Sequence, residues 1–153
     1  IWFGSEEKGL VGSQNYVKSH EGEMSRHVFN LNVDLAGQLL GGNVLGVTAD
    51  PTVCAELKNL MEENQLGVTI KNQVWASDSN TFAWKGVPAL TLNRDGFGMH
   101  TRHDTVEYIS PRALAEGAKI LCTAAAWVAN EPELSFVREI PEDMKKKLEK
   151  YFA

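Results

Sequence analysis

The hydrophobic and polar positions along the chain predict strands in five places. Residues 27–35 (HVFNLNVDL) alternate between apolar and polar side chains, as a half-buried strand does. Short apolar runs at 43–48, 68–76 and 87–92, bounded by Gly, Asn and Asp, predict three more strands. The apolar run at the very start, Ile1–Gly4, predicts a fifth strand that is short and buried.

Helical spacing and capping residues predict helices between and after these strands. Asp50 before Pro51 and Ser110 before Pro111 are typical helix starts, with a capping side chain followed by Pro at the first helical position. In the longest helix the predicted buried stripe is Leu114, Ala118, Leu121, Ala125 and Val128. The predicted helices are 9–19, 50–64, 77–86, 110–130 and 141–152, with surface loops at 21–26 and 95–98.

Strands that alternate with helices predict an α/β layered fold with a mostly parallel or mixed sheet. The chain has 153 residues, 43% hydrophobic and 23% charged, which suits one globular domain. A net charge of -5 argues against a nucleic-acid partner, and no apolar run approaches the roughly 18 residues of a membrane span. Cys54 and Cys122 occupy apolar helical positions, which favours buried free thiols and leaves a disulfide open.

Four polar sites fall at strand ends, where loops of such sheets carry chemistry. They are the pair Glu6-Glu7, then Asp34, Asp78 and His100. Glu, Asp and His are zinc ligands, and a neighbouring carboxylate supplies a general base. Three also have a purely structural interpretation: a favourable charge at a helix start for the Glu pair, a cap for Asp78, a local hydrogen bond for His100. Asp34 is harder to explain in this way, because Asp is depleted in strands and costly to bury without a partner. The motifs HExxH, GxSxG and a phosphate loop do not occur.

The order of these residues matches a known pattern. The matching stretches are FGSEEKGLVGSQNYV (3–17), NLNVDLAG (30–37), SDSNTFAWKGVPAL (77–90) and HTRHDTVEYISPRAL (100–114). From residue 1 to about residue 129 the chain resembles the co-catalytic di-zinc aminopeptidase family, which includes bacterial leucyl aminopeptidases. The resemblance implies a three-layer α/β/α sandwich that hydrolyses the N-terminal peptide bond of peptides with a free N-terminus.

The resemblance also implies a role for each matching residue. Glu6 corresponds to the general base and Glu7 to a zinc ligand. His100 shares the metal of Glu7, and Asp34 binds the other zinc of a two-zinc site. Asp104 would orient the loop or the imidazole from behind the ligands.

Two positions depart from the family pattern. Ser79 stands where the family often has His, which leaves the role of Asp78 open. No tyrosine occupies a position that would stabilise the oxyanion, because Met99 precedes His100 and Tyr108 lies beyond the motif.

Family members supply a further His ligand and a bridging Asp from segments upstream of the Glu pair. We therefore expect residues 1–153 to be the C-terminal portion of one zinc peptidase catalytic domain, N-terminally incomplete and inactive or nearly so alone. A related di-zinc carboxypeptidase, deacylase or cyclase is the alternative enzyme. A degenerate domain used for association is the non-enzymatic alternative, with homo-oligomers formed through an exposed sheet edge.

Overall fold

A four-stranded sheet lies at the centre of the molecule. The computed structural model describes residues 1–94, 96–131 and 133–152, so Asp95 of the predicted loop lies outside the described residues. The strands are β1 (Asn30–Val33), β2 (Asn43–Thr48), β3 (Thr69–Asn72) and β4 (Ala89–Arg94), in the order β1-β4-β2-β3. β1 is parallel to β4 and β2 is parallel to β3, but β2 and β4 are antiparallel. The expected mixed sheet is confirmed.

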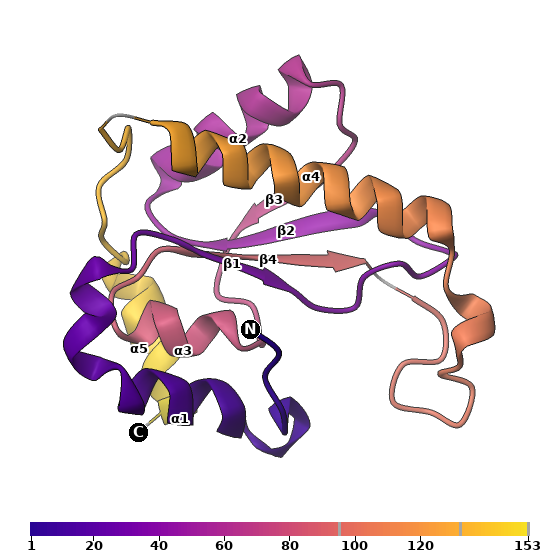
Figure 1. Ribbon diagram of the computed structural model, residues 1–153, viewed down its shortest axis with the longest axis horizontal. Coiled ribbons are helices and arrows are strands. Elements are labelled where there is room, and N and C mark those ends of the chain that lie inside the picture. Colours follow the sequence, from indigo (N-terminus) through magenta and orange to yellow (C-terminus); the bar gives the residue numbers. More distant parts are fainter. Residues whose placement is uncertain (95, 132, 153) are drawn as a thin grey trace.

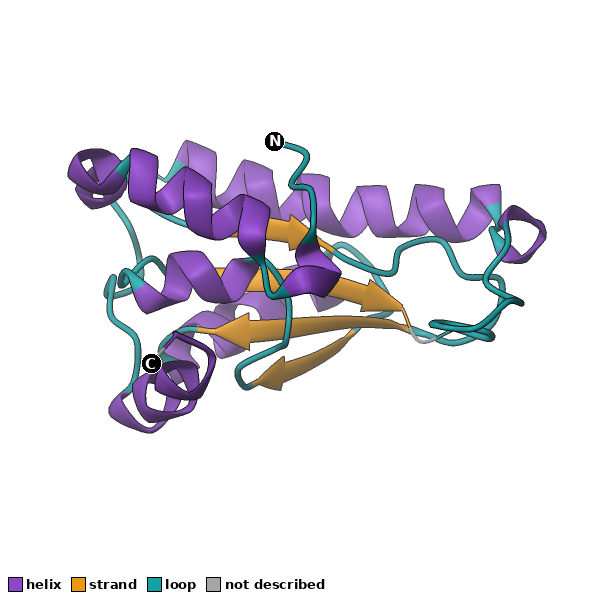
Figure 2. Ribbon diagram, turned by 90° about the horizontal axis from the view of Figure 1, so that it is seen from below, coloured by secondary structure: helices purple, strands orange, loops and turns teal. Residues whose placement is uncertain are grey.

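Helices cover both faces of this sheet and make three layers (Figure 1). One face carries α2 (Pro51–Glu63) and α4 (Pro111–Asn130), and the other carries α1 (Val11–Ser19), α3 (Ser79–Trp84) and α5 (Glu142–Phe152). Figure 2 shows the same sheet from below, with the second group of helices nearest the viewer. Three short 3-10 helices complete the described elements: η1 (Glu6–Lys8), η2 (Glu21–Arg26) and η3 (Val106–Tyr108).

The main core fills the space between the sheet and the α2–α4 layer. Alternation along β4 points Leu90 and Leu92 into this core, where they meet Leu57 of α2 and Ile120 of α4. Both predicted caps are present: the Asp50 carboxylate accepts from the Thr52 N–H at 2.9 Å, and the Ser110 hydroxyl accepts from the Ala113 N–H at 3.3 Å. The starts of α2 and α4 therefore follow directly from their sequences.

The predicted buried stripe of α4 is displaced by one residue. The buried positions are Ala113, Gly117, Ile120 and Ala124, and Leu114 is exposed. The small residues let α4 lie close to the sheet, since a Cβ added at Gly117 would approach the Leu92 side chain to 3.0 Å. The same displacement leaves Cys122 exposed, so its predicted burial is wrong. Both cysteines are free, and Cys54 is partly buried.

Two further predictions are wrong. Residues 1–4 form no strand, and Ile1 and Trp2 are almost completely exposed because no neighbouring strand among the described residues pairs with them. Phe3 alone packs inward, against Tyr16 and Phe82. The predicted loop 21–26 is the 3-10 helix η2, which buries Met24 in this second apolar cluster.

The strand β1 forms one edge of the sheet. Within the described part of the chain β4 is its only strand partner, and Val33 is exposed. The predicted exposed edge is therefore present, and association through it stays a prediction. None of the described helices has the length and apolar character needed to cross a membrane.

Candidate active site

The four leading candidate residues meet in one pocket at the ends of β1 and β4. Glu6, Glu7, Asp34 and His100 line this pocket, which has a volume of about 350 Å³. They come from three segments that are far apart in the sequence, so only the fold brings them together. The other lining residues are Leu35, Trp75, Ala76, Asn93 and Met99.

The Glu pair is held by close contact between its own segment and the start of α1. The Val11 N–H donates to the Ser5 carbonyl at 3.3 Å, and the Gly12 N–H donates to the Gly4 carbonyl at 3.0 Å. These are N–H groups of the first helical turn, which have no partner inside the helix. A Cβ at Gly12 would lie 2.5 Å from the Gly4 oxygen, so this approach requires glycine. Gly12 of the stretch FGSEEKGLVGSQNYV thus fixes where η1 presents its carboxylates.

Asp34 follows directly from the last residue of β1. Its N–H donates to the Leu92 carbonyl at 2.9 Å, which continues the pairing of β1 with β4 by one residue. Leu35 then adopts a left-handed conformation (φ 53°), and its carbonyl accepts from the Arg94 N–H at 3.1 Å. Asp34 consequently lies just beyond the end of β1 and lines the same pocket as the Glu pair.

His100 is presented by a tight loop after β4. The Gly98 carbonyl accepts from the Thr101 N–H at 2.9 Å, and His100 lies within this turn at φ 61°. A positive φ is uncommon for residues other than glycine, and such strain concentrates at functional sites. Gly98 itself is at φ 84°, where a Cβ would come within 2.8 Å of the His103 carbonyl.

His100 and Glu7 are close enough to share one metal ion. The His100 Nδ1 and a Glu7 Oε lie 3.4 Å apart, and both side chains are mostly exposed. Two ligands of a tetrahedral zinc, each about 2.0–2.2 Å from the ion, are themselves about 3.4 Å apart. The pair therefore fits one zinc. Within the ranges that the structure describes, no group of three or more His, Cys, Asp or Glu side chains is gathered closely enough to hold a metal.

Glu6 differs from Glu7 in its surroundings. Partial burial is the main cause that raises the pKa of Glu6 above its ordinary value, and the negative charges of Asp34, Glu7 and Asp78 raise it further. His100 acts in the opposite direction. A carboxylate whose proton affinity is raised in this way is a stronger general base.

Asp78 occupies the N-cap position of α3, but its side chain does not cap the helix. The residue is buried, and its Oδ1 has no hydrogen-bond partner among the described residues. Burial is the main cause that raises the pKa of Asp78, and the hydrogen bond from Ser13 opposes it. Asp104 is exposed, and the Thr101 carbonyl accepts from its backbone N–H at 3.1 Å.

The raised pKa of Asp78 predicts a stabilising substitution in the metal-free protein. The folded state holds the Asp78 proton more tightly than the unfolded state, so the protonated group contributes stability below its ordinary pKa, and this contribution is lost as the pH rises through the raised value. We expect Asp78→Asn to stabilise the fold at pH 7.5 by about 1 kcal/mol, or about 2–4 °C in Tm, and not at pH 3. Thermal denaturation in EDTA tests this, with the exposed Asp104→Asn as control. A lower Tm for Asp78→Asn at pH 7.5 would contradict it.

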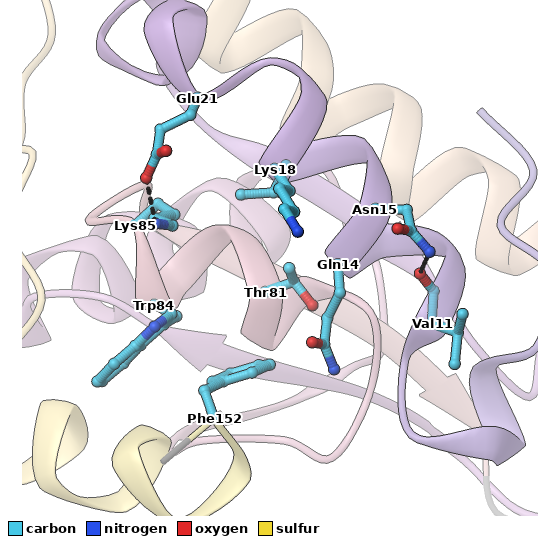
Figure 3. A pocket seen from close by; sticks show the side chains of 10 residues that line it. Val11, Gln14, Asn15, Lys18, Glu21, Thr81, Trp84, Lys85 and Phe152 are labelled. Atoms are coloured by element: carbon cyan, nitrogen blue, oxygen red, sulfur yellow. Dashed lines mark hydrogen bonds and ion pairs between the residues drawn. The ribbon is translucent and has the colours of Figure 1, made fainter.

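A second pocket, of about 460 Å³, lies between α1, α3 and α5 (Figure 3). Trp84 and Phe152 stack at its rim, with ring centroids 5.8 Å apart, and Lys85 binds Glu21 at 2.6 Å beside them. None of the four leading candidates lines it. The chemistry expected from the sequence therefore belongs to the pocket at the strand ends.

Comparison with known families decides the lineage. The model of peptidase family M28 matches residues 1–125. The chain belongs to this family. A probable leucine aminopeptidase of Arthroderma benhamiae is 26% identical over 131 residues, which are 78% of this chain and 36% of that protein. Carboxypeptidase Q of Rattus norvegicus is 27% identical over 136 residues, 85% of this chain and 28% of that protein.

Two solved aminopeptidase structures have the same fold. BSAP, a zinc aminopeptidase from Bacillus subtilis, superposes with a TM-score of 0.69 at 28% identity, over 94% of this chain and 38% of its own. The aminopeptidase of Aneurinibacillus sp. strain AM-1 also superposes with a TM-score of 0.69, at 27% identity, over 92% of this chain and 35% of its own. The expected zinc-exopeptidase-like α/β sandwich is confirmed. The chain spans between about a quarter and two fifths of these relatives' lengths.

Sequence reasoning missed the remaining walls of the pocket. Leu35, Trp75 and Met99 carry no motif, because an apolar side chain at a pocket wall has the same sequence pattern as one in a core. Asn93 did leave a signal: it interrupts the apolar strand ALTLNR, and Asn is depleted in strands.

Proposed function

We propose that the protein to which this chain belongs is a zinc-dependent aminopeptidase, and that the pocket at the strand ends is part of its active site. One observation carries the proposal: Glu6, Glu7, Asp34 and His100 line one pocket, with His100 and Glu7 spaced as ligands of one zinc. Membership of family M28 and the likeness to the Bacillus subtilis zinc aminopeptidase and the Aneurinibacillus aminopeptidase support the same chemistry.

Each residue has a separate task in the proposed reaction. Glu7 and His100 would hold one zinc ion and Asp34 a second. Bound zinc would polarise the scissile carbonyl and lower the pKa of a bound water. Glu6, whose pKa is raised, accepts a proton from the attacking water and then donates it to the leaving amine. The negative charge of Glu6, Glu7 and Asp34 attracts the free α-amino group of a peptide, which favours exopeptidase action.

Glu7, His100 and Asp34 leave both zinc sites incomplete, because a catalytic zinc takes three protein ligands. The resemblance to di-zinc aminopeptidases attributes the missing ligands to a His and a bridging Asp from upstream segments. We therefore expect the 153-residue polypeptide alone to hydrolyse aminoacyl-p-nitroanilides negligibly.

A substrate panel on the full-length protein tests the proposal against its main alternative. Carboxypeptidase Q is among the relatives, so a carboxypeptidase is the second candidate. The panel pairs a peptide blocked at its N-terminus with the same peptide blocked at its C-terminus. We expect chelator-sensitive cleavage of the peptide with a free N-terminus only. Cleavage of the N-blocked peptide alone, or of neither, would contradict the aminopeptidase.

A further inference from the structure

The pocket at the strand ends contains one buried polar side chain that the proposed chemistry does not use. Asn93 lies in β4, is 3% exposed, and lines the pocket together with the Glu pair, Asp34 and His100. Alternation along β4 turns Leu90 and Leu92 into the core and Thr91 and Asn93 toward the opposite face. A residue disfavoured in strands thus stands at the wall of the candidate active site.

The polar side chains near Asn93 form hydrogen bonds with one another and not with its Oδ1. Thr91 bonds to the Ser79 hydroxyl at 2.7 Å, and Asn32 donates to the Ser77 hydroxyl at 2.6 Å. The Asn93 Oδ1 is buried without a hydrogen-bond partner in the described part of the chain. A buried acceptor without a partner costs folding free energy, and at the wall of a pocket a ligand can supply the missing donor.

The rest of the wall beside Asn93 is apolar. Leu35, Trp75 and Met99 complete it, and the Trp75 ring lies directly on β2, where a Cβ at Gly46 would approach it to 2.8 Å. The Lys71 side chain lies over the same ring, with its Nζ 5.7 Å from the ring centroid. A pocket with an apolar wall and one carboxamide can bind a medium-sized side chain and hydrogen-bond a single polar group on it.

We propose that Asn93 is a specificity-determining residue that hydrogen-bonds the side chain of the substrate's N-terminal residue. The pocket then favours an uncharged side chain that ends in a hydrogen-bonding group, such as the amide of glutamine, over the apolar methionine of similar length. This inference rests on the proposed aminopeptidase function and goes beyond it by naming the substrate class.

The test compares glutamine and methionine p-nitroanilides on the full-length protein and on Asn93→Leu. Leucine keeps the approximate size of the side chain and removes its hydrogen bonds. We expect the ratio of kcat/KM for glutamine over methionine to fall about tenfold, the value of one buried hydrogen bond. Asn80→Leu is the matched control. Asn80 is also fully buried, and neither its Oδ1 nor its Nδ2 has a partner among the described residues, but it lies outside the pocket and should leave the ratio unchanged.

Two outcomes overturn the inference while the aminopeptidase stands. One is an unchanged ratio in Asn93→Leu. The other is an equal loss of kcat/KM on both substrates, which would mean that Asn93 contacts a part common to all peptides. If Asn93→Leu does not fold, Asn93→Val, with a side chain suited to strands, gives the same comparison. Only failure of the unsubstituted protein to cleave the peptide with a free N-terminus in the substrate panel as well would contradict the proposed function itself.

Discussion

Replacing Glu6 by Gln in the full-length protein is expected to lower kcat for peptide hydrolysis by about 10²- to 10⁴-fold. Gln keeps the shape and much of the hydrogen bonding of Glu but cannot accept the proton of the attacking water. Burial of part of Glu6 raises its pKa, and the charges of Asp34, Glu7 and Asp78 raise it further, which makes the carboxylate a stronger proton acceptor. Zinc content should not change, because Glu6 is assigned as base and not as ligand.

Steady-state kinetics together with metal analysis check this result. Glu23→Gln is the matched control, since Glu23 is an exposed residue of η2 and does not line the pocket. A Glu6→Gln protein that keeps kcat within tenfold of the unsubstituted protein would contradict the role of Glu6 as general base. Loss of zinc together with activity would instead make Glu6 a ligand, which also contradicts the assignment.

The second large effect is expected at His100. His100→Ala removes the imidazole whose Nδ1 lies 3.4 Å from the Glu7 carboxylate. We therefore expect zinc affinity to fall by about tenfold to a hundredfold, with loss of activity. His103→Ala serves as the control, because His103 belongs to the same exposed loop but does not line the pocket. Competition with a zinc-binding dye measures both affinities. Equal affinities in the two variants would contradict His100 as a ligand.

Local sequence signals predicted the elements whose ends are set by the chain itself. The Asp-Pro and Ser-Pro starts of α2 and α4 appear in the structure with their capping hydrogen bonds. The apolar run at residues 1–4 predicts a strand equally clearly, yet it forms none. A strand needs a neighbouring strand to pair with, and the local sequence does not show whether that neighbour is present. The stripe of α4 was displaced for a related reason: the close approach at Gly117 is a property of the packed pair of layers.

The candidate site divides in the same way. The order of motifs was sufficient to select Glu6, Glu7, Asp34 and His100, and the fold brings all four to one pocket. Their roles remain proposals. Trp75 and Asn93 could not be assigned to that pocket from the sequence, because their positions depend on how β2, β4 and the segment after β3 lie against one another.

The central claim is that Glu7, His100 and Asp34 bind zinc in the pocket that also contains Glu6. Diffraction from crystals of the full-length, zinc-loaded protein, recorded on both sides of the zinc absorption edge, tests it most directly. We predict an anomalous peak about 2.0–2.2 Å from both Glu7 and His100, and a second peak at that distance from Asp34. Zinc peaks elsewhere in the molecule, with none in contact with these three side chains, would contradict the account.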